Sequence, residues 1–116
     1  MATTAIMATT GNDLRIPLSA VVYQESRWWI AHCLELDLVA EGKSPDDAIQ
    51  TLYRLTELQL GKAMEEGDIT SAFHPAPADV WRMYWIAGKQ PDSRAAPRFK
   101  LKAPVDRFET RQLVLT

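Results

Sequence analysis

The chain has few cysteines, few histidines and no long apolar segment. Its single cysteine, Cys33, excludes an internal disulfide and a multi-cysteine metal cluster, which is typical of a protein in a reducing compartment. No apolar run approaches the ~20 residues of a membrane helix, and the first residues, MATTAIMATTGND, lack the basic and apolar parts of a secretory signal. We therefore expect a soluble, cytoplasmic protein that has no membrane partner.

A strong overall charge of either sign is also lacking, because the net charge is −2 over 116 residues. This balance gives no indication of nucleic acid as the partner. The two halves differ, however: residues 1–66 carry five Lys/Arg against ten Asp/Glu, and residues 67–116 carry eight against five. The asymmetry favours a protein partner of complementary charge: the acidic half could contact a basic partner, or the basic half an acidic one.

The length and the hydrophobic content of 47% predict one globular domain. Residues 1–13 are mostly small and polar, and we expect a disordered tail there. Residues 14–116 then form a single domain.

Three extended segments are predicted early in this domain. Residues 15–23 alternate in the period of two that is typical of a strand, and residues 24–27 are polar, as a hairpin loop requires. Residues 28–33 are rich in aromatic and β-branched side chains, and residues 36–41 form the third strand. Three consecutive strands of this kind predict an antiparallel meander.

A helix is predicted to begin at Ser44. The hydroxyl of Ser44 suits an N-cap, Pro45 suits the first helical position, and Asp47 completes a shortened capping box. The helix should end between Gly61 and Gly67. Apolar or small residues recur at helical spacing on the side expected to face the sheet: Ala48, Ile49, Leu52, Leu55 and Thr56.

The remaining residues predict a short second helix over 79–87, capped by Asp79, a loop over 89–98, and two possible strands over 98–102 and 107–115. Together these elements predict an α+β fold: an antiparallel three-stranded meander, a packed helix and a further C-terminal strand.

The stretch around His32 and Cys33 resembles a catalytic site in its residue types. A cysteine nucleophile would need His32 as its base, but neighbours along a strand project to opposite faces. The two side chains are therefore not expected to meet. His74 precedes a proline and has no ligand spacing around it, and no glycine-rich phosphate loop is present, so we expect neither a metal ion nor a cofactor.

Glu35, Asp37 and Glu41 are spaced to share one face if the third strand is regular through them. With His32 they could hold a cation in a small metal-dependent hydrolase or nuclease. They could equally be the solvent side of a sheet whose other face is covered by the helix, which is the more common arrangement.

Four tryptophans are more than one core of this size easily hides, which favours a subunit or partner interface rich in aromatic residues. Alternatively, the second helix folds over the open face of the sheet and covers the spare tryptophan. Lysines and arginines near the C-terminus could contact RNA but also protect an edge strand, and the second role is more common. The candidate interface residues are Trp28, Trp29, Trp81, Tyr84, Trp85 and Arg111.

A run of residues within this region resembles the HicB-like family, the antitoxin partners of HicA-type RNA-cleaving toxins. The family run has the form W-x-A-x-C-L-E-x-D-x-x-x-x-G-x-[ST]-x-x-[DE]-A, and the resemblance covers roughly residues 15–85. The matching residues are Trp29, Ala31, Cys33, Leu34, Glu35, Asp37, Gly42, Ser44, Asp47 and Ala48.

The resemblance implies a partial ferredoxin-like or degenerate RNase H-like domain without catalytic activity. It also implies a toxin–antitoxin system, in which the antitoxin covers the RNA-cleaving surface of its toxin. Family members often append a DNA-binding domain, but fewer than thirty residues follow residue 88 here and they are predicted to be loop and strand. We therefore expect a non-enzymatic HicB-like protein that self-associates and binds a protein partner without binding DNA or RNA. The resemblance implies that this partner is a HicA-like toxin.

Overall fold

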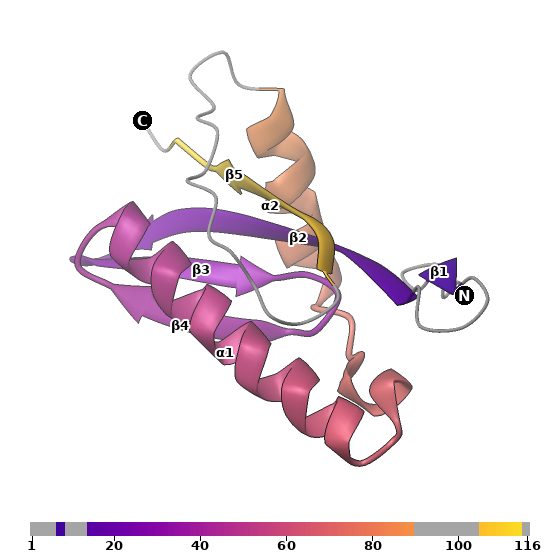
Figure 1. Cartoon of the computed structure of the whole chain (residues 1–116). Helices are drawn as coiled ribbons and strands as arrows, with labels where there is room; N and C mark the ends of the chain where they lie inside the picture. The colour runs from indigo at the N-terminus through magenta and orange to yellow at the C-terminus, as the bar shows by residue number, and fades with distance from the viewer. Residues whose placement is uncertain (1–6, 9–13, 90–104, 115–116) are drawn as a thin grey trace.

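The computed structural model describes residues 7–8, 14–89 and 105–114, and within them it confirms the predicted α+β class. The elements, shown in Figure 1, are β1 (Met7–Ala8), β2 (Leu14–Glu25), β3 (Trp28–Cys33), β4 (Leu38–Gly42), α1 (Pro45–Glu65), the short 3₁₀ helix η1 (Ile69–Ala72), α2 (Ala78–Gly88) and β5 (Val105–Gln112).

The strands form a mixed sheet in which β2 is central. β2 pairs antiparallel with β3 on one side and parallel with β5 on the other, and β3 pairs antiparallel with β4, which gives the order β5-β2-β3-β4. The short strand β1 pairs with Leu14 and Arg15 at the start of β2. The predicted meander is therefore present as β2, β3 and β4.

The turns of the meander correct two predicted boundaries. The loop between β2 and β3 is shorter than predicted, because Glu25 pairs with Trp28 and only Ser26 and Arg27 remain between them. Ser26 has φ 59°, as the first central residue of a tight hairpin turn of type II′ requires. The third strand begins at Leu38 instead of residue 36, because residues 34–37 form a turn.

Helix α1 starts as its sequence predicts. The hydroxyl of Ser44 accepts a hydrogen bond from the Asp47 amide at 3.1 Å, and the Asp47 carboxylate accepts one from the Lys43 amide at 3.0 Å. Gly42 lies so close to the first turn of α1 that a Cβ there would overlap the backbone of Ala48. The helix ends at Glu65, between Gly61 and Gly67 as predicted. Gly67 follows with φ 74°, a left-handed conformation that is common just after a helix.

One face of the sheet is covered by α1, which lies across β3 and β4 (Figure 1). Buried side chains of α1 pack there against alternate residues of the strands, as the period of two requires. The largest fully buried members of this core are Ile16, Leu18, Leu52 and Leu60.

The opposite face carries α2, which packs on β2 and β5 around a second cluster that includes Val21, Leu34, Val80, Tyr84 and Leu113. The predicted second helix is thus confirmed, but its N-cap is Pro77 instead of Asp79. The molecule therefore has three layers, with the sheet between α1 and α2.

The C-terminal strand is confirmed as β5, which begins at Val105 instead of residue 107 and ends at Gln112. The predicted strand over 98–102, most of the predicted 89–98 loop and most of the predicted 1–13 tail lie outside the described residues. No helix among the described residues is long and apolar enough to cross a membrane.

Candidate functional site

The polar residues that resemble a catalytic site lie on and beside the turn at 34–37, which reverses the chain between β3 and β4. The Leu34 amide donates a hydrogen bond to the Ser19 carbonyl at 2.9 Å, which ties the turn to β2. Asp37 has φ 52°, a left-handed conformation that aspartate tolerates better than most residues. Leu34 and Leu36 are both buried, so the turn is anchored from either side.

Glu35 points back from this turn toward β2. Its Oε1 accepts a hydrogen bond from the Ser19 amide at 2.7 Å and lies 3.9 Å from Cys33 Sγ. Burial raises the pKa of the Glu35 carboxyl, although the hydrogen bond from Ser19 acts in the opposite direction. The carboxyl therefore has a structural role in holding the turn at 34–37 to β2.

Cys33 is fully buried on the α1 side of the sheet. Burial raises the pKa of its thiol, and the nearby Glu35 carboxylate raises it further. Reactive cysteines need a thiolate and access to solvent. Cys33 therefore has the properties of a core residue rather than those of a nucleophile.

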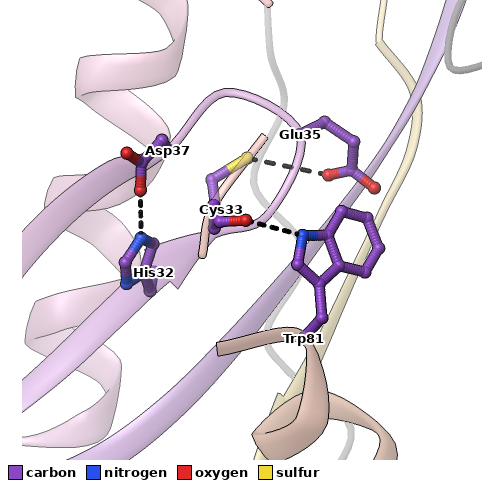
Figure 2. Close-up of polar contacts among 6 residues, drawn as sticks. His32, Cys33, Glu35, Asp37 and Trp81 are labelled. Atoms are coloured by element: carbon purple, nitrogen blue, oxygen red, sulfur yellow. Dashed lines mark hydrogen bonds and ion pairs between the residues drawn. The ribbon is translucent and has the colours of Figure 1, made fainter. Parts of the chain in front are cut away.

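His32 projects from the opposite face of β3, as predicted, so it does not contact Cys33 (Figure 2). Its Nε2 lies 2.6 Å from Asp37 Oδ1, and its Nδ1 is buried without a hydrogen-bond partner. Nε2 is therefore engaged by Asp37, and Nδ1 is shielded from solvent.

The prediction that Glu35, Asp37 and Glu41 share one face is wrong. Glu35 and Asp37 belong to the turn and project to different sides of it (Figure 2), whereas Glu41 is an exposed residue of β4. The strand was assumed to be regular through these residues, and the turn breaks the alternation. Among the described residues, no group of three or more His, Cys, Asp or Glu side chains could hold a metal ion.

The turn is also hydrogen-bonded to the segment that precedes α2. The amides of His74 and Ala76 donate to the carbonyls of Glu35 at 3.1 Å and Leu34 at 2.7 Å. The Ala76 carbonyl in turn accepts from Trp81 Nε1 at 3.1 Å. Sequence reasoning missed this attachment, although the prolines at 75 and 77 favour the extended backbone that it requires.

A second cluster joins β5 to the end of α2. Arg111 Cζ lies 4.1 Å from the centre of the Tyr84 ring and 5.5 Å from that of Trp85, while Nη2 lies 2.8 Å from Glu109 Oε2. Gly88 leaves room for the guanidinium, since a Cβ there would overlap it. The cation thus lies at the C-terminal end of α2, where the helix dipole stabilises it.

The candidate interface residues divide into those that the chain covers and those that it leaves exposed. Tyr84 is buried, and Trp29, Trp81 and Arg111 are half-buried with contacts inside the chain. Trp85 is 56% exposed and Trp28 is 40% exposed. Helix α2 therefore does cover a face of the sheet without burying Trp28, and an interface at the two exposed tryptophans stays a prediction.

The exposed apolar side chains on the α2 side of the sheet extend beyond these tryptophans. Val39 pairs with His32, which pairs with Val21, and Val21 packs in the cluster beneath α2. Val39 and, by alternation, Trp28 therefore project from the same face that carries α2. We call Trp28, Val39, Trp85 and Ile86 the α2-side apolar surface.

Comparison of the chain with protein-family models, with curated proteins and with solved structures gives no match.

Proposed function

We propose that the chain is a HicB-like domain that self-associates and binds a second protein without catalysing a reaction, and that its partner is a HicA-type RNA-cleaving toxin. The proposal rests first on the resemblance of the run from Trp29 to Ala48 to that family. It is supported by the roles of the polar residues in the run, because Glu35 holds β2 and Asp37 contacts His32.

One observation carries the proposal. The polar side chains of Glu35 and Asp37 are hydrogen-bonded within the chain, whereas the side chains of the α2-side apolar surface are exposed. These four side chains lie on the same side of the sheet, and a protein partner that covered them would remove their apolar area from water. Trp28 and Trp85 are of the residue type most enriched at protein interfaces. The site therefore favours contact with another protein.

The charges beside this surface indicate which charge the partner carries where it makes contact. By the alternation of the strands, Glu25 and Glu41 project from the same face as Trp28 and Val39, and both carboxylates are exposed. Trp28 and Val39, the strand part of this surface, are thus bordered by carboxylates, which suits a partner that presents basic groups to this part. A protein that binds and cleaves RNA has a basic surface of this kind, because RNA is a polyanion.

Copurification and inhibition of RNA cleavage test the proposal together. A tagged chain is coexpressed with a HicA-type toxin encoded by a neighbouring gene, and RNA cleavage by the purified toxin is measured as the chain is added. We expect the toxin to be retained and inhibited, and we expect Val39→Lys or Glu41→Lys to weaken both effects. Gln59→Lys, at an exposed position on α1, is the matched control and should change neither.

The proposal is abandoned if the wild-type chain neither retains nor inhibits the toxin, or if no toxin-like gene neighbours its own. The competing hypothesis is a small metal-dependent hydrolase that uses Glu35, Asp37 and His32. Calorimetric titration with Mg²⁺, Mn²⁺ and Zn²⁺ separates the two: a metal-binding site would give saturable heat that Asp37→Asn reduces. Under our proposal, neither protein gives such heat.

A further inference from the structure

The outer side of α1 carries the most exposed large apolar side chain among the described residues. Leu58 is 71% exposed, and Met64, further along the helix, is 48% exposed. The opposite side of α1 packs on the sheet through Leu52 and Leu60. The exposed leucine therefore plays no part in the core of its own chain.

Gly61 lies next to Leu58 on this outer side, one helical turn further on. Glycine in the interior of a helix is destabilising relative to alanine, so it needs a compensating reason. Its backbone is helical, and a Cβ at this position would meet no atom within 4 Å. The chain's own packing therefore gives no reason for glycine, whereas the close approach of a second helix would.

Four residues form a row along this outer side. Arg54, Leu58, Gly61 and Glu65 are separated by four, three and four residues, which is the spacing of the seam in a two-helix coiled coil. The row has a cation at one end, an anion at the other, and a large and a small residue between them. This order is complementary to itself when the direction of the helix is reversed.

An antiparallel second copy, related by a two-fold axis that passes between residues 59 and 60, brings complementary groups together. Leu58 of each copy then lies opposite Gly61 of the other, so that a large side chain meets the open space at a glycine. Arg54 of each copy lies opposite Glu65 of the other. A two-fold interface of this kind repeats each contact, giving two leucine–glycine contacts and two ion pairs.

We propose that two copies of the chain associate through the outer side of α1, antiparallel, with Leu58 packed on Gly61 and Arg54 paired with Glu65 across the interface. The inference deepens the self-association included in the proposed function and rests on that part of it alone. The outer side of α1 and the α2-side apolar surface lie on opposite sides of the sheet (Figure 1). A dimer formed through α1 therefore leaves the α2-side apolar surface free for a different protein.

Sedimentation equilibrium of the full chain at low ionic strength, over a range of concentrations, tests this interface. We expect the wild-type mass to rise with concentration from 13.1 kDa toward twice that value. Arg54→Glu places like charges opposite each other at both ends, so we expect the dissociation constant to rise at least about tenfold. Adding Glu65→Arg to that variant restores opposite charges and should bring the constant back to within about threefold of the wild type.

Two further variants serve as a charge control and as a test of the apolar contact. Arg82→Glu changes the charge by the same amount at an exposed position of α2 and should leave the dissociation constant unchanged. Leu58→Glu should abolish association while the circular dichroism spectrum and melting temperature stay those of a folded monomer, because the side chain is not part of the core.

A wild-type chain that remains monomeric at every concentration overturns the α1 interface, as does a dimer that is insensitive to Arg54→Glu and Leu58→Glu. If such a dimer is instead dissociated by Trp85→Glu, self-association occurs through α2. Binding and inhibition of the toxin are measured separately, so failure of the α1 interface is distinguishable from failure of the proposed function.

Discussion

The Cζ of Arg111 lies 4.1 Å from the centre of the Tyr84 ring, so the last strand of the sheet holds the last turn of α2 through one stacked side chain. The same guanidinium lies 2.8 Å from Glu109 Oε2 and donates from Nη1 to the Tyr84 carbonyl over a longer distance of 3.4 Å. Arg111 therefore joins β5, α2 and the cluster beneath α2 at a single point.

Arg111→Ala should lower the free energy of unfolding by about 1–2 kcal/mol, because it removes both the cation–π contact and the packing of the aliphatic stem. Arg111→Lys keeps the charge but loses the planar fork, so an intermediate loss is expected. Urea denaturation measures both. Arg82→Ala, exposed on the same helix, should change the free energy by less than about 0.5 kcal/mol. Equal effects at the two positions would contradict the anchoring role of Arg111.

Asp37 combines a left-handed backbone with a short contact to His32, and two substitutions separate these contributions. Asp37→Asn retains both a residue that tolerates φ 52° and an oxygen acceptor, so we expect a loss below about 1 kcal/mol. Asp37→Ala loses the acceptor and is strained in this conformation, so a loss of about 2–3 kcal/mol is expected. Chemical denaturation at constant pH distinguishes these values. If the two variants are equally stable, the turn does not depend on the Asp37 side chain.

The elements that could be predicted from the sequence are those encoded by neighbouring residues. Alternation of apolar side chains predicted the three strands of the meander, and Ser44, Pro45 and Asp47 predicted where α1 begins. Alternation along β3 also predicted correctly that His32 and Cys33 project to opposite faces. All of these features depend on backbone geometry within a few residues.

The features that could not be predicted depend on a break in that geometry or on contacts between distant residues. Leu34 and Leu36 continue the apolar alternation through the turn, which concealed the change of direction at Asp37. The contact of Arg111 with Tyr84 joins residues 27 positions apart, and no local pattern specifies such a contact. The sequence therefore drew attention to His32, Cys33 and Glu35, but it did not predict how the carboxylates of this stretch are grouped.

Glu35 should give the stability of the protein a measurable pH dependence. Burial raises the pKa of its carboxyl above the usual value, so the folded state binds this proton more tightly than the unfolded chain. The resulting stabilisation is fully present below the unfolded pKa and is lost as the pH rises through the folded pKa. Glu35→Gln removes this titration but keeps an oxygen that can accept from the Ser19 amide.

The free energy of unfolding of Glu35→Gln, relative to the wild type, should therefore increase as the pH is raised from about 4 to about 7. Urea denaturation of both proteins at several pH values measures this difference. Glu41→Gln, which removes a carboxylate from an exposed position of β4, is measured alongside as the control for the loss of one negative charge. A difference for Glu35→Gln that decreases with pH would show that the hydrogen bond from Ser19 outweighs the effect of burial.

Gly42 and Gly61 should respond in opposite directions to the same substitution. A Cβ at Gly42 would overlap the backbone of Ala48, so Gly42→Ala forces β4 and α1 apart and should cost about 1–3 kcal/mol. A Cβ at Gly61 meets open space within a helix, so Gly61→Ala should stabilise a single chain by about 1 kcal/mol. Urea denaturation at a concentration where the mass is that of one chain tests both. Destabilisation by Gly61→Ala under those conditions would mean that the glycine serves the fold of its own chain, and the reason for expecting a second helix beside it would be lost.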